Sequence, residues 1–163
     1  MASKESFRVY VTKDYLKFSA AHFIAYQGFR EALHGHNYRV SIAAQGELGS
    51  QGYVVDFGVV KRIARRLCDS LDETMLIPVD SDCLTIRQEG NAVIVQYEDD
   101  EFRFPRGDVT LLPIVHTSVE ELARYLTEEL KKELTKEGVS GITAVEVGVE
   151  ESFGQAAYYR QES

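Results

Sequence analysis

The chain has 163 residues, 44% of them hydrophobic and 27% charged, and these ordinary fractions predict one compact domain over residues 1–163. Its formal net charge of -8 repels nucleic acid and anionic membranes, and no basic patch in the sequence would reverse that field. We therefore expect no nucleic-acid partner and no membrane partner. A small anionic substrate is still compatible with this charge, because a few basic side chains in one pocket can outweigh distant charges.

Cysteine usage indicates a reducing compartment. Cys68 and Cys83 are the only two cysteines, and their spacing matches neither a zinc knuckle nor a redox pair. No apolar stretch near the first residues resembles a signal peptide or a bilayer-spanning segment. We expect a cytoplasmic protein with two free thiols.

Two long strands are predicted at the start of the chain. Residues 7–23 should be extended, with Phe18, Ala20 and His22 on one face, because successive side chains of a strand alternate between faces. Apolar and polar residues alternate again over residues 34–46, which predicts a second strand. The two strands are close in the sequence, so we expect them to pair in an antiparallel sheet.

Two amphipathic helices are predicted further along the chain. The first follows Asp56 and carries an apolar stripe with basic residues largely opposite. That stripe contains Val59, Val60, Ile63, Ala64 and Leu67. The second begins with the capping-box pattern of residues 118–121 and should end near Gly138. Leucines recur along it every four residues, at Leu122, Leu126, Leu130 and Leu134.

Strands are also predicted on both sides of the second helix. Residues 92–97 and 102–104 are rich in β-forming side chains and flank an acidic turn, so they predict a hairpin inserted between the helices. Residues 142–150 and 156–160 predict a closing pair of strands. The resulting order indicates an α+β fold, in which an antiparallel sheet carries both helices on one face.

Three of the four histidines should lie close together. His34 and His36 are two residues apart at the start of a strand and point to the same side, while His22 ends the preceding strand. If the strands pair, three neutral imidazoles converge, which suits zinc and leaves a fourth position open to water or substrate, as in catalytic sites. The alternative is that they are ordinary polar strand residues, because His-x-His is a short pattern. His116, before a helix cap, is expected to be structural.

Several ordered motifs run along nearly the whole chain. They are Phe18-Ser19-Ala20-Ala21-His22, Leu33-His34-Gly35-His36-Asn37-Tyr38, Gly52-Tyr53-Val54-Val55-Asp56-Phe57-Gly58, Leu71-Asp72, Ser118 with Glu120, and Val147-Gly148-Val149-Glu150-Glu151-Ser152. Together these motifs resemble the 6-pyruvoyltetrahydropterin synthase and 6-carboxytetrahydropterin synthase family. The resemblance implies a T-fold subunit whose sheet joins those of other subunits in a barrel. Such barrels are commonly homohexamers, dimers of trimers with sites at subunit boundaries.

The resemblance also implies the ligands of the site. A zinc ion would be the cofactor, and its ligands would be His22, His34 and His36. Glu151 would anchor a pterin substrate, since a carboxylate can accept two parallel hydrogen bonds from the ring N3–H and its amino group. The Val-x-Val-x-Glu register selects Glu151 rather than Glu150. Ser118 and Glu120, at the second helix, are the other expected substrate-binding residues.

Two departures from the family pattern concern the catalytic residues. The synthases carry a cysteine that acts as a catalytic base shortly before His-Gly-His. In this chain residues 27–33 contain no cysteine, and Glu31 lies three residues before His34. Glu-x-x-His-Gly-His, together with the inserted hairpin, resembles a subgroup of the family found in malaria parasites and some bacteria. The synthases also carry Leu-Asp-His where this chain has Glu73 after Asp72. We therefore expect Glu31 to be the general base, with Asp72 and Glu73 as further catalytic candidates.

The resemblance to that subgroup implies a zinc-dependent lyase that serves folate synthesis. It would cleave the side chain of 7,8-dihydroneopterin, or of its triphosphate, to give 6-hydroxymethyl-7,8-dihydropterin. Three alternatives stay open at this point. The chain is a 6-pyruvoyl- or 6-carboxytetrahydropterin synthase acting on dihydroneopterin triphosphate, a non-catalytic pterin-binding protein, or a three-histidine iron oxygenase, for which nothing else in the sequence marks an oxygen site.

Overall fold

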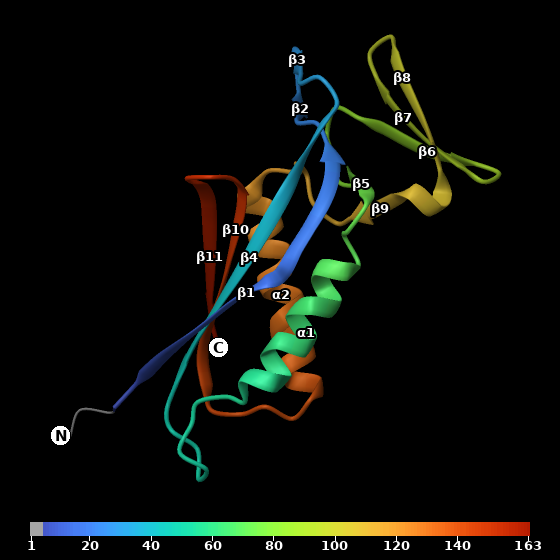
Figure 1. Ribbon diagram of the computed structural model, residues 1–163. Coiled ribbons are helices and arrows are strands. Elements are labelled where there is room, and N and C mark those ends of the chain that lie inside the picture. The colour runs from blue at the N-terminus through green and yellow to red at the C-terminus, as the bar shows by residue number, and fades with distance from the viewer. Residues whose placement is uncertain (1–4) are drawn as a thin grey trace.

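The computed structural model describes residues 5–163, and its centre is a pair of long strands (Figure 1). β1 (Phe7–His22) runs antiparallel to β4 (His34–Gly46). The register places His22 opposite His34, so that the last residue of one strand faces the first residue of the other. The predicted pairing of these strands is confirmed.

Four more strands complete a six-stranded sheet in the order β11-β10-β4-β1-β5-β9. They are β5 (Thr74–Pro78), β9 (Val109–Leu112), β10 (Ile142–Ser152) and β11 (Gln155–Glu162). The sheet is antiparallel from β11 to β1, as predicted, whereas β5 and β9 are added in parallel. The sequence pattern does not predict these last two strands, because short apolar runs lack the alternation of a half-buried strand.

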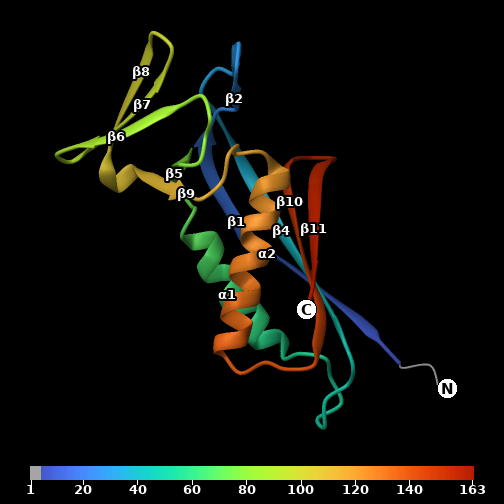
Figure 2. The same ribbon diagram turned by 180° about the vertical axis from the view of Figure 1, so that it is seen from behind.

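Both helices cover the same face of the sheet, which confirms the predicted α+β arrangement (Figures 1 and 2). α1 (Phe57–Asp69) begins after Asp56, whose carboxylate accepts a hydrogen bond of 2.7 Å from the amide of Gly58. Its predicted apolar stripe packs against the sheet. The fully buried members of that stripe are Val60, Ile63 and Ala64.

α2 (Val119–Lys136) begins with the predicted cap, in which the Ser118 hydroxyl accepts a hydrogen bond from the amide of Glu121. The Glu121 carboxylate accepts hydrogen bonds from the amides of Val115 and His116 and so holds the segment before the helix. All four predicted leucines are buried. No helix in the described part of the chain is long and apolar enough to cross a membrane.

The main core fills the space between the helices and the sheet. Alternate residues of β4 point into it, among them Tyr38, Val40 and Ile42. Cys68 of α1 lies in this core, where burial raises the pKa of its thiol to about 12. Cys83 is partly buried, and both cysteines are free, as predicted.

A second, three-stranded sheet is inserted between the helices. It consists of β6 (Thr85–Glu89), β7 (Ala92–Tyr97) and β8 (Asp100–Pro105), all antiparallel, and a 3-10 turn η1 (Arg106–Asp108) leads from it to β9. The predicted hairpin is confirmed as β7 and β8. β6 extends it by a third strand that the sequence pattern does not indicate.

A short hairpin, β2 (Ala25–Tyr26) and β3 (Phe29–Arg30), connects β1 to β4. It lies at the same end of the molecule as the inserted sheet (Figures 1 and 2). A smaller core joins the two, and its buried residues are Phe23, Ala25, Met75, Ile77, Val93, Val95, Tyr97 and Val109. The inserted sheet therefore supports the segment between the two central strands.

Candidate metal and active site

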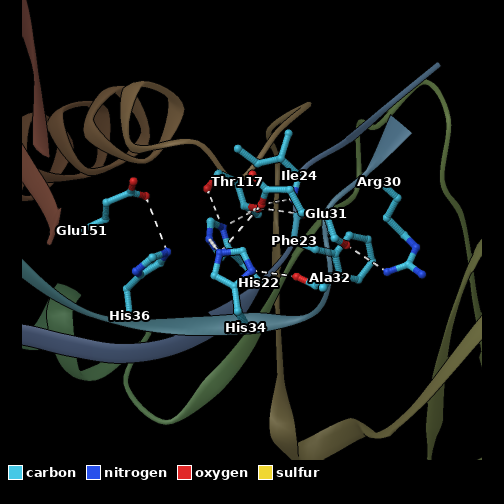
Figure 3. Close-up of polar contacts among 10 residues, drawn as sticks. All are labelled: His22, Phe23, Ile24, Arg30, Glu31, Ala32, His34, His36, Thr117 and Glu151. Carbon is cyan, nitrogen blue, oxygen red and sulfur yellow. Dashed lines mark hydrogen bonds and ion pairs between the residues drawn. The ribbon is translucent and has the colours of Figure 1, made fainter. Parts of the chain in front are cut away.

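The three clustered histidines lie where β1 ends and β4 begins. His22 is opposite His34, and His36 is opposite Ala20, so alternation along the strands turns all three rings to the helix-covered side. Figure 3 shows the rings pointing toward one another. One ligand atom from each ring lies within 4.8 Å of the others. The convergence expected from the sequence is therefore present.

Hydrogen bonds to main-chain carbonyls define the tautomers of two of these rings. His22 Nδ1 is 3.0 Å from the carbonyl oxygen of Thr117, and His34 Nδ1 is 2.7 Å from that of Ala32. A carbonyl oxygen can only accept, so each Nδ1 carries the proton and each Nε2 carries a lone pair. Hydrogen bonds of this kind are typical of metal-binding histidines, because they orient the ring and leave the other nitrogen free.

The spacing of the free nitrogens fits a zinc ion. Nε2 of His22 and Nε2 of His34 are 3.1 Å apart, although two lone pairs cannot hydrogen-bond to each other. Two nitrogens bound at 2.0 to 2.1 Å to a tetrahedral zinc lie roughly 3.3 Å apart. Burial lowers the pKa of His22 to about 4, so this ring is neutral at pH 7 and able to bind a metal. The donor set therefore matches zinc.

Glu31 lies beside this cluster, in the segment between β3 and β4. Its Oε2 is 3.8 Å from Nε2 of His34 and accepts a hydrogen bond of 3.1 Å from the amide of Ile24. The amide of Glu31 donates in turn to the carbonyl of Ile24. The carboxylate is thus held next to Nε2 of His34 while its side chain keeps 34% of its exposure, which leaves it accessible to a small molecule.

Glu151 approaches the cluster from β10, on the side away from Glu31 (Figure 3). Its Oε2 is 3.7 Å from Nε2 of His36. Glu150 instead lines a different hollow together with Arg39, because neighbouring residues of a strand point to opposite faces. Glu151, and not Glu150, therefore lies beside the histidine cluster.

Asp72 and Glu73 do not join the cluster within this chain. The Asp72 carboxylate accepts a hydrogen bond of 2.8 Å from the amide of Ser19, and the Glu73 amide donates to the Ser19 carbonyl. Both residues line a hollow of about 490 Å³ that contains none of the three histidines, although Glu73 also borders a neighbouring hollow that reaches His36. Among the described residues, no hydrogen bond or ion pair connects either carboxylate to Glu31.

Ser118 and Glu120, the substrate-binding residues expected at the second helix, lie at the start of α2. The Ser118 hydroxyl is used as the N-cap of α2. Glu120 is exposed in the first turn of that helix. Neither side chain contacts the three histidines through a hydrogen bond or ion pair in the part of the chain that the structure describes.

The structure adds residues that sequence reasoning missed. Thr117 holds the His22 ring, but it lies 95 residues away in the chain, so no local pattern points to it. Tyr38 stacks on Phe18 and lies with its ring centre 5.4 Å from that of His36. The sequence signal for Tyr38 was its position two residues after His36, which puts both side chains on the same face of the strand. The Tyr38 hydroxyl is buried without a hydrogen-bond partner in the described chain, and burial raises its pKa.

Comparison with known proteins identifies the family. Residues 10–162 match the family model described as 6-pyruvoyl tetrahydropterin synthase. The chain belongs to this family. Within it, a protein from Methanocaldococcus jannaschii named "Putative 6-carboxy-5,6,7,8-tetrahydropterin synthase" is 35% identical to this chain over 147 residues, which is 90% of each sequence.

Solved structures of synthases from malaria parasites have the same T-fold. The 6-pyruvoyl tetrahydropterin synthase of Plasmodium vivax is 36% identical, with a TM-score of 0.92 over 98% of this chain and 99% of that one. The Plasmodium falciparum synthase is 37% identical, with a TM-score of 0.91 over 97% and 99% of the two chains. Versions of the P. vivax synthase in which alanine or cysteine replaces a glutamate are described as catalytic residue mutants. The predicted family and fold are confirmed.

Proposed function

We propose that this synthase-family chain is a zinc-dependent pterin lyase that converts 7,8-dihydroneopterin or its triphosphate into 6-hydroxymethyl-7,8-dihydropterin. The observation that carries the proposal is the Glu31 carboxylate, 3.8 Å from Nε2 of His34, in the segment where the synthases resembled by this sequence carry a cysteine. The P. vivax relative, in which a glutamate is described as a catalytic residue, supports the same assignment.

Substrate recognition is assigned to Glu151. Its ionised carboxylate can accept hydrogen bonds from the N3–H and the amino group of a pterin ring, a planar donor pair that matches two carboxylate oxygens. Because Glu151 and Glu31 approach the histidines from different sides, a ring held by Glu151 would direct its side chain toward Glu31 (Figure 3). Ser118 and Glu120 remain candidate binding residues from the sequence.

Bond cleavage then needs one proton to be moved. Zinc held by His22, His34 and His36 would supply Lewis acidity toward the hydroxyl groups of the side chain. Glu31 accepts the proton of the hydroxyl on the second side-chain carbon as the bond between the first and second carbons breaks. The bonding electron pair passes into the conjugated dihydropterin ring, and a proton returned to the first carbon gives the hydroxymethyl group. The second carbon leaves as an aldehyde.

A second candidate function is 6-carboxytetrahydropterin synthesis, or the related 6-pyruvoyl reaction, from dihydroneopterin triphosphate. The name and 35% identity of the M. jannaschii relative favour the former. Both reactions need protons to be moved on the same side chain. Asp72 would then correspond to the aspartate of the synthases, and Glu73 would stand in place of their histidine. A non-catalytic pterin-binding protein would need only the Glu151 contact.

Product analysis separates these functions. Zinc-loaded protein is incubated with dihydroneopterin and, separately, with its triphosphate, and the pterin products are identified by mass spectrometry. The lyase gives 6-hydroxymethyl-7,8-dihydropterin as the main product, with an aldehyde in equal amount. A 6-carboxy or 6-pyruvoyl product would replace the lyase by a synthase, and binding without any product would indicate a non-catalytic protein.

The proposed enzyme is a cytoplasmic homohexamer, with each site completed at a boundary between subunits. The openness of the cluster in one chain supports this assembly, because the His34 and Glu31 side chains keep 38% and 34% of their exposure. Asp72 lines a hollow that contains none of the three histidines of its own chain, so a neighbouring subunit would have to supply it to the cluster.

A further inference from the structure

The segment that carries Glu31 has little regular structure to hold it. The β2–β3 hairpin consists of two residue pairs, Ala25 with Arg30 and Tyr26 with Phe29. A two-stranded hairpin of this size is not stable on its own. A catalytic carboxylate has to be held to within about 0.5 Å of its productive position. Contacts from outside the hairpin therefore have to position this segment.

Arg30 makes such contacts in two directions. Its Nη1 donates a hydrogen bond of 2.9 Å to the main-chain carbonyl of Glu31, the next residue. Its Nη2 pairs at 2.7 Å with the carboxylate of Asp100, which lies 70 residues further along the chain at the start of β8. One guanidinium thus joins the main chain of Glu31 to the inserted sheet.

Aromatic residues support the same guanidinium. Its central carbon is 5.0 Å from the ring centre of Phe102 and 5.5 Å from that of Phe23, within the range of cation–π contacts. The two rings stack on each other at 4.8 Å. Arg30 lies directly beside Phe23 in Figure 3, and its side chain is only 21% exposed. The arginine is therefore fixed by packing as well as by its hydrogen bonds.

The inserted sheet also reaches the other strand of the hairpin. The Tyr97 hydroxyl of β7 donates a hydrogen bond of 3.2 Å to the carbonyl of Tyr26. Contacts from β7 and β8 thus hold the hairpin at both of its strands. The only described link from that sheet to Glu31 itself runs through Arg30.

We propose that Arg30 is a positioning residue that fixes the Glu31 carboxylate beside His34 by anchoring the Glu31 main chain to the β6–β8 sheet. The inference rests on the proposed role of Glu31 as the general base. Lysine cannot replace this arginine, because a single ammonium lacks the planar fork that reaches two acceptors in fixed directions. Arg30 Nε is buried without a partner in the described chain, which is unfavourable for a side chain kept for stability alone.

The amide of Ile24 offers a test that does not depend on activity. It donates to Oε2 of Glu31, so its hydrogen exchange reports whether the carboxylate stays in place. In zinc-loaded Arg30→Lys we expect this amide to exchange about tenfold faster than in the wild type. Asp100→Asn keeps the arginine and removes only its charged partner, so a smaller change in the same direction is expected. Arg103→Lys is the matched control, because Arg103 forms an exposed ion pair with Glu89 on the same sheet.

Steady-state kinetics provide the second readout, with dihydroneopterin or its triphosphate as the substrate, whichever the wild type converts. Arg30→Lys should lower kcat about 10- to 100-fold with KM and zinc content unchanged, as expected when a catalytic group is misplaced and the binding groups are not. In a Glu31→Gln background, Arg30→Lys should have no further effect, because both changes remove the same function. Arg103→Lys should behave as the wild type in every assay.

Three outcomes would overturn the proposal for Arg30. These are an Ile24 amide that exchanges at the wild-type rate in Arg30→Lys, an effect on kcat that adds to that of Glu31→Gln, or a loss of zinc and of the folded state as the main consequence of both Arg30→Lys and Asp100→Asn. Failure of the proposed lyase would be seen separately, in the products of the wild type. In that case the exchange of the Ile24 amide still decides the role of Arg30.

Discussion

Nε2 of His22 lies 3.1 Å from Nε2 of His34, across the paired ends of β1 and β4. Each ring donates its Nδ1–H to a main-chain carbonyl, so both facing nitrogens carry lone pairs. The strand register and these two hydrogen bonds therefore prepare a position in which both nitrogens could bind one cation. Such preparation favours tight metal binding, because the protein does not have to reorganise to bind the ion.

Replacing His34 by alanine should remove the zinc and most of the activity but leave the protein folded, because the leucine core of α2 does not depend on the metal. Zinc per subunit can be measured by inductively coupled plasma mass spectrometry, and folding by circular dichroism. His116→Ala is the control, since His116 lies outside the cluster, and it should keep its zinc. Loss of folding together with zinc in His34→Ala would instead indicate a structural metal site.

Acid should destabilise the metal-free protein through His22. Its pKa is about 4 in the folded chain, against an ordinary value of 6.5, so between these values the unfolded chain takes up a proton that the folded chain does not. The free energy of unfolding therefore has its full contribution from neutral His22 above pH 6.5. It decreases by about 3 kcal/mol as the pH falls toward 4. Urea unfolding of chelator-treated protein at several pH values measures this loss. Metal-free His22→Gln should show a shallower slope, and equal slopes would contradict the prediction.

Glu151→Gln should weaken pterin binding by about 2 to 5 kcal/mol, because a neutral amide offers one acceptor oxygen where the carboxylate offers two charged ones. Titration calorimetry of the zinc-loaded protein with dihydroneopterin measures the change. Glu150→Gln is the matched control, since its side chain lines a different hollow, and it should bind the pterin as the wild type does. Unchanged affinity in Glu151→Gln would redirect the assignment to Glu120.

Glu31→Gln should keep zinc and pterin binding and lower kcat by about 10²- to 10⁴-fold, because an amide cannot accept the proton. Single-turnover measurements on the zinc-loaded variant test the chemical step directly. Full turnover in this variant would exclude Glu31 as the base. Glu31→Cys restores a thiol near the position of the synthase cysteine, so we expect its products to shift toward 6-pyruvoyltetrahydropterin. If Glu31→Cys forms no 6-pyruvoyl product, the expected shift is wrong, and Glu73, which stands where the synthases carry a histidine, would be the residue to change next.

If Asp72 acts on the site of a neighbouring subunit, two inactive variants should restore activity when they are mixed. Glu31→Gln and Asp72→Asn subunits are dissociated, combined and reassembled, and turnover is compared with that of each variant alone. A mixed assembly contains some sites with both carboxylates intact, so part of the wild-type activity should return. An assembly without recovered activity would place both residues in the site of one chain or remove Asp72 from the reaction.

Local sequence patterns were sufficient for the features that depend on one element at a time. His34 and His36 share a face because side chains two apart in a strand point the same way. Ser118 caps α2 because its hydroxyl reaches the amide three residues ahead, a contact within a single turn. The long strands, both helices and the histidine cluster could therefore be predicted, and so could the placement of Glu31 near the cluster in sequence.

Only the tertiary structure decided which distant segments meet. Nothing in the residues near His22 indicates that Thr117 will orient its ring, and nothing near Arg30 indicates that Asp100 will pair with it. The parallel pairing of β5 with β1 and with β9 was not predicted either, because these partners lie far apart in the chain. Such contacts contribute free energy only after the chain has closed long loops, so they leave no periodic trace in the sequence.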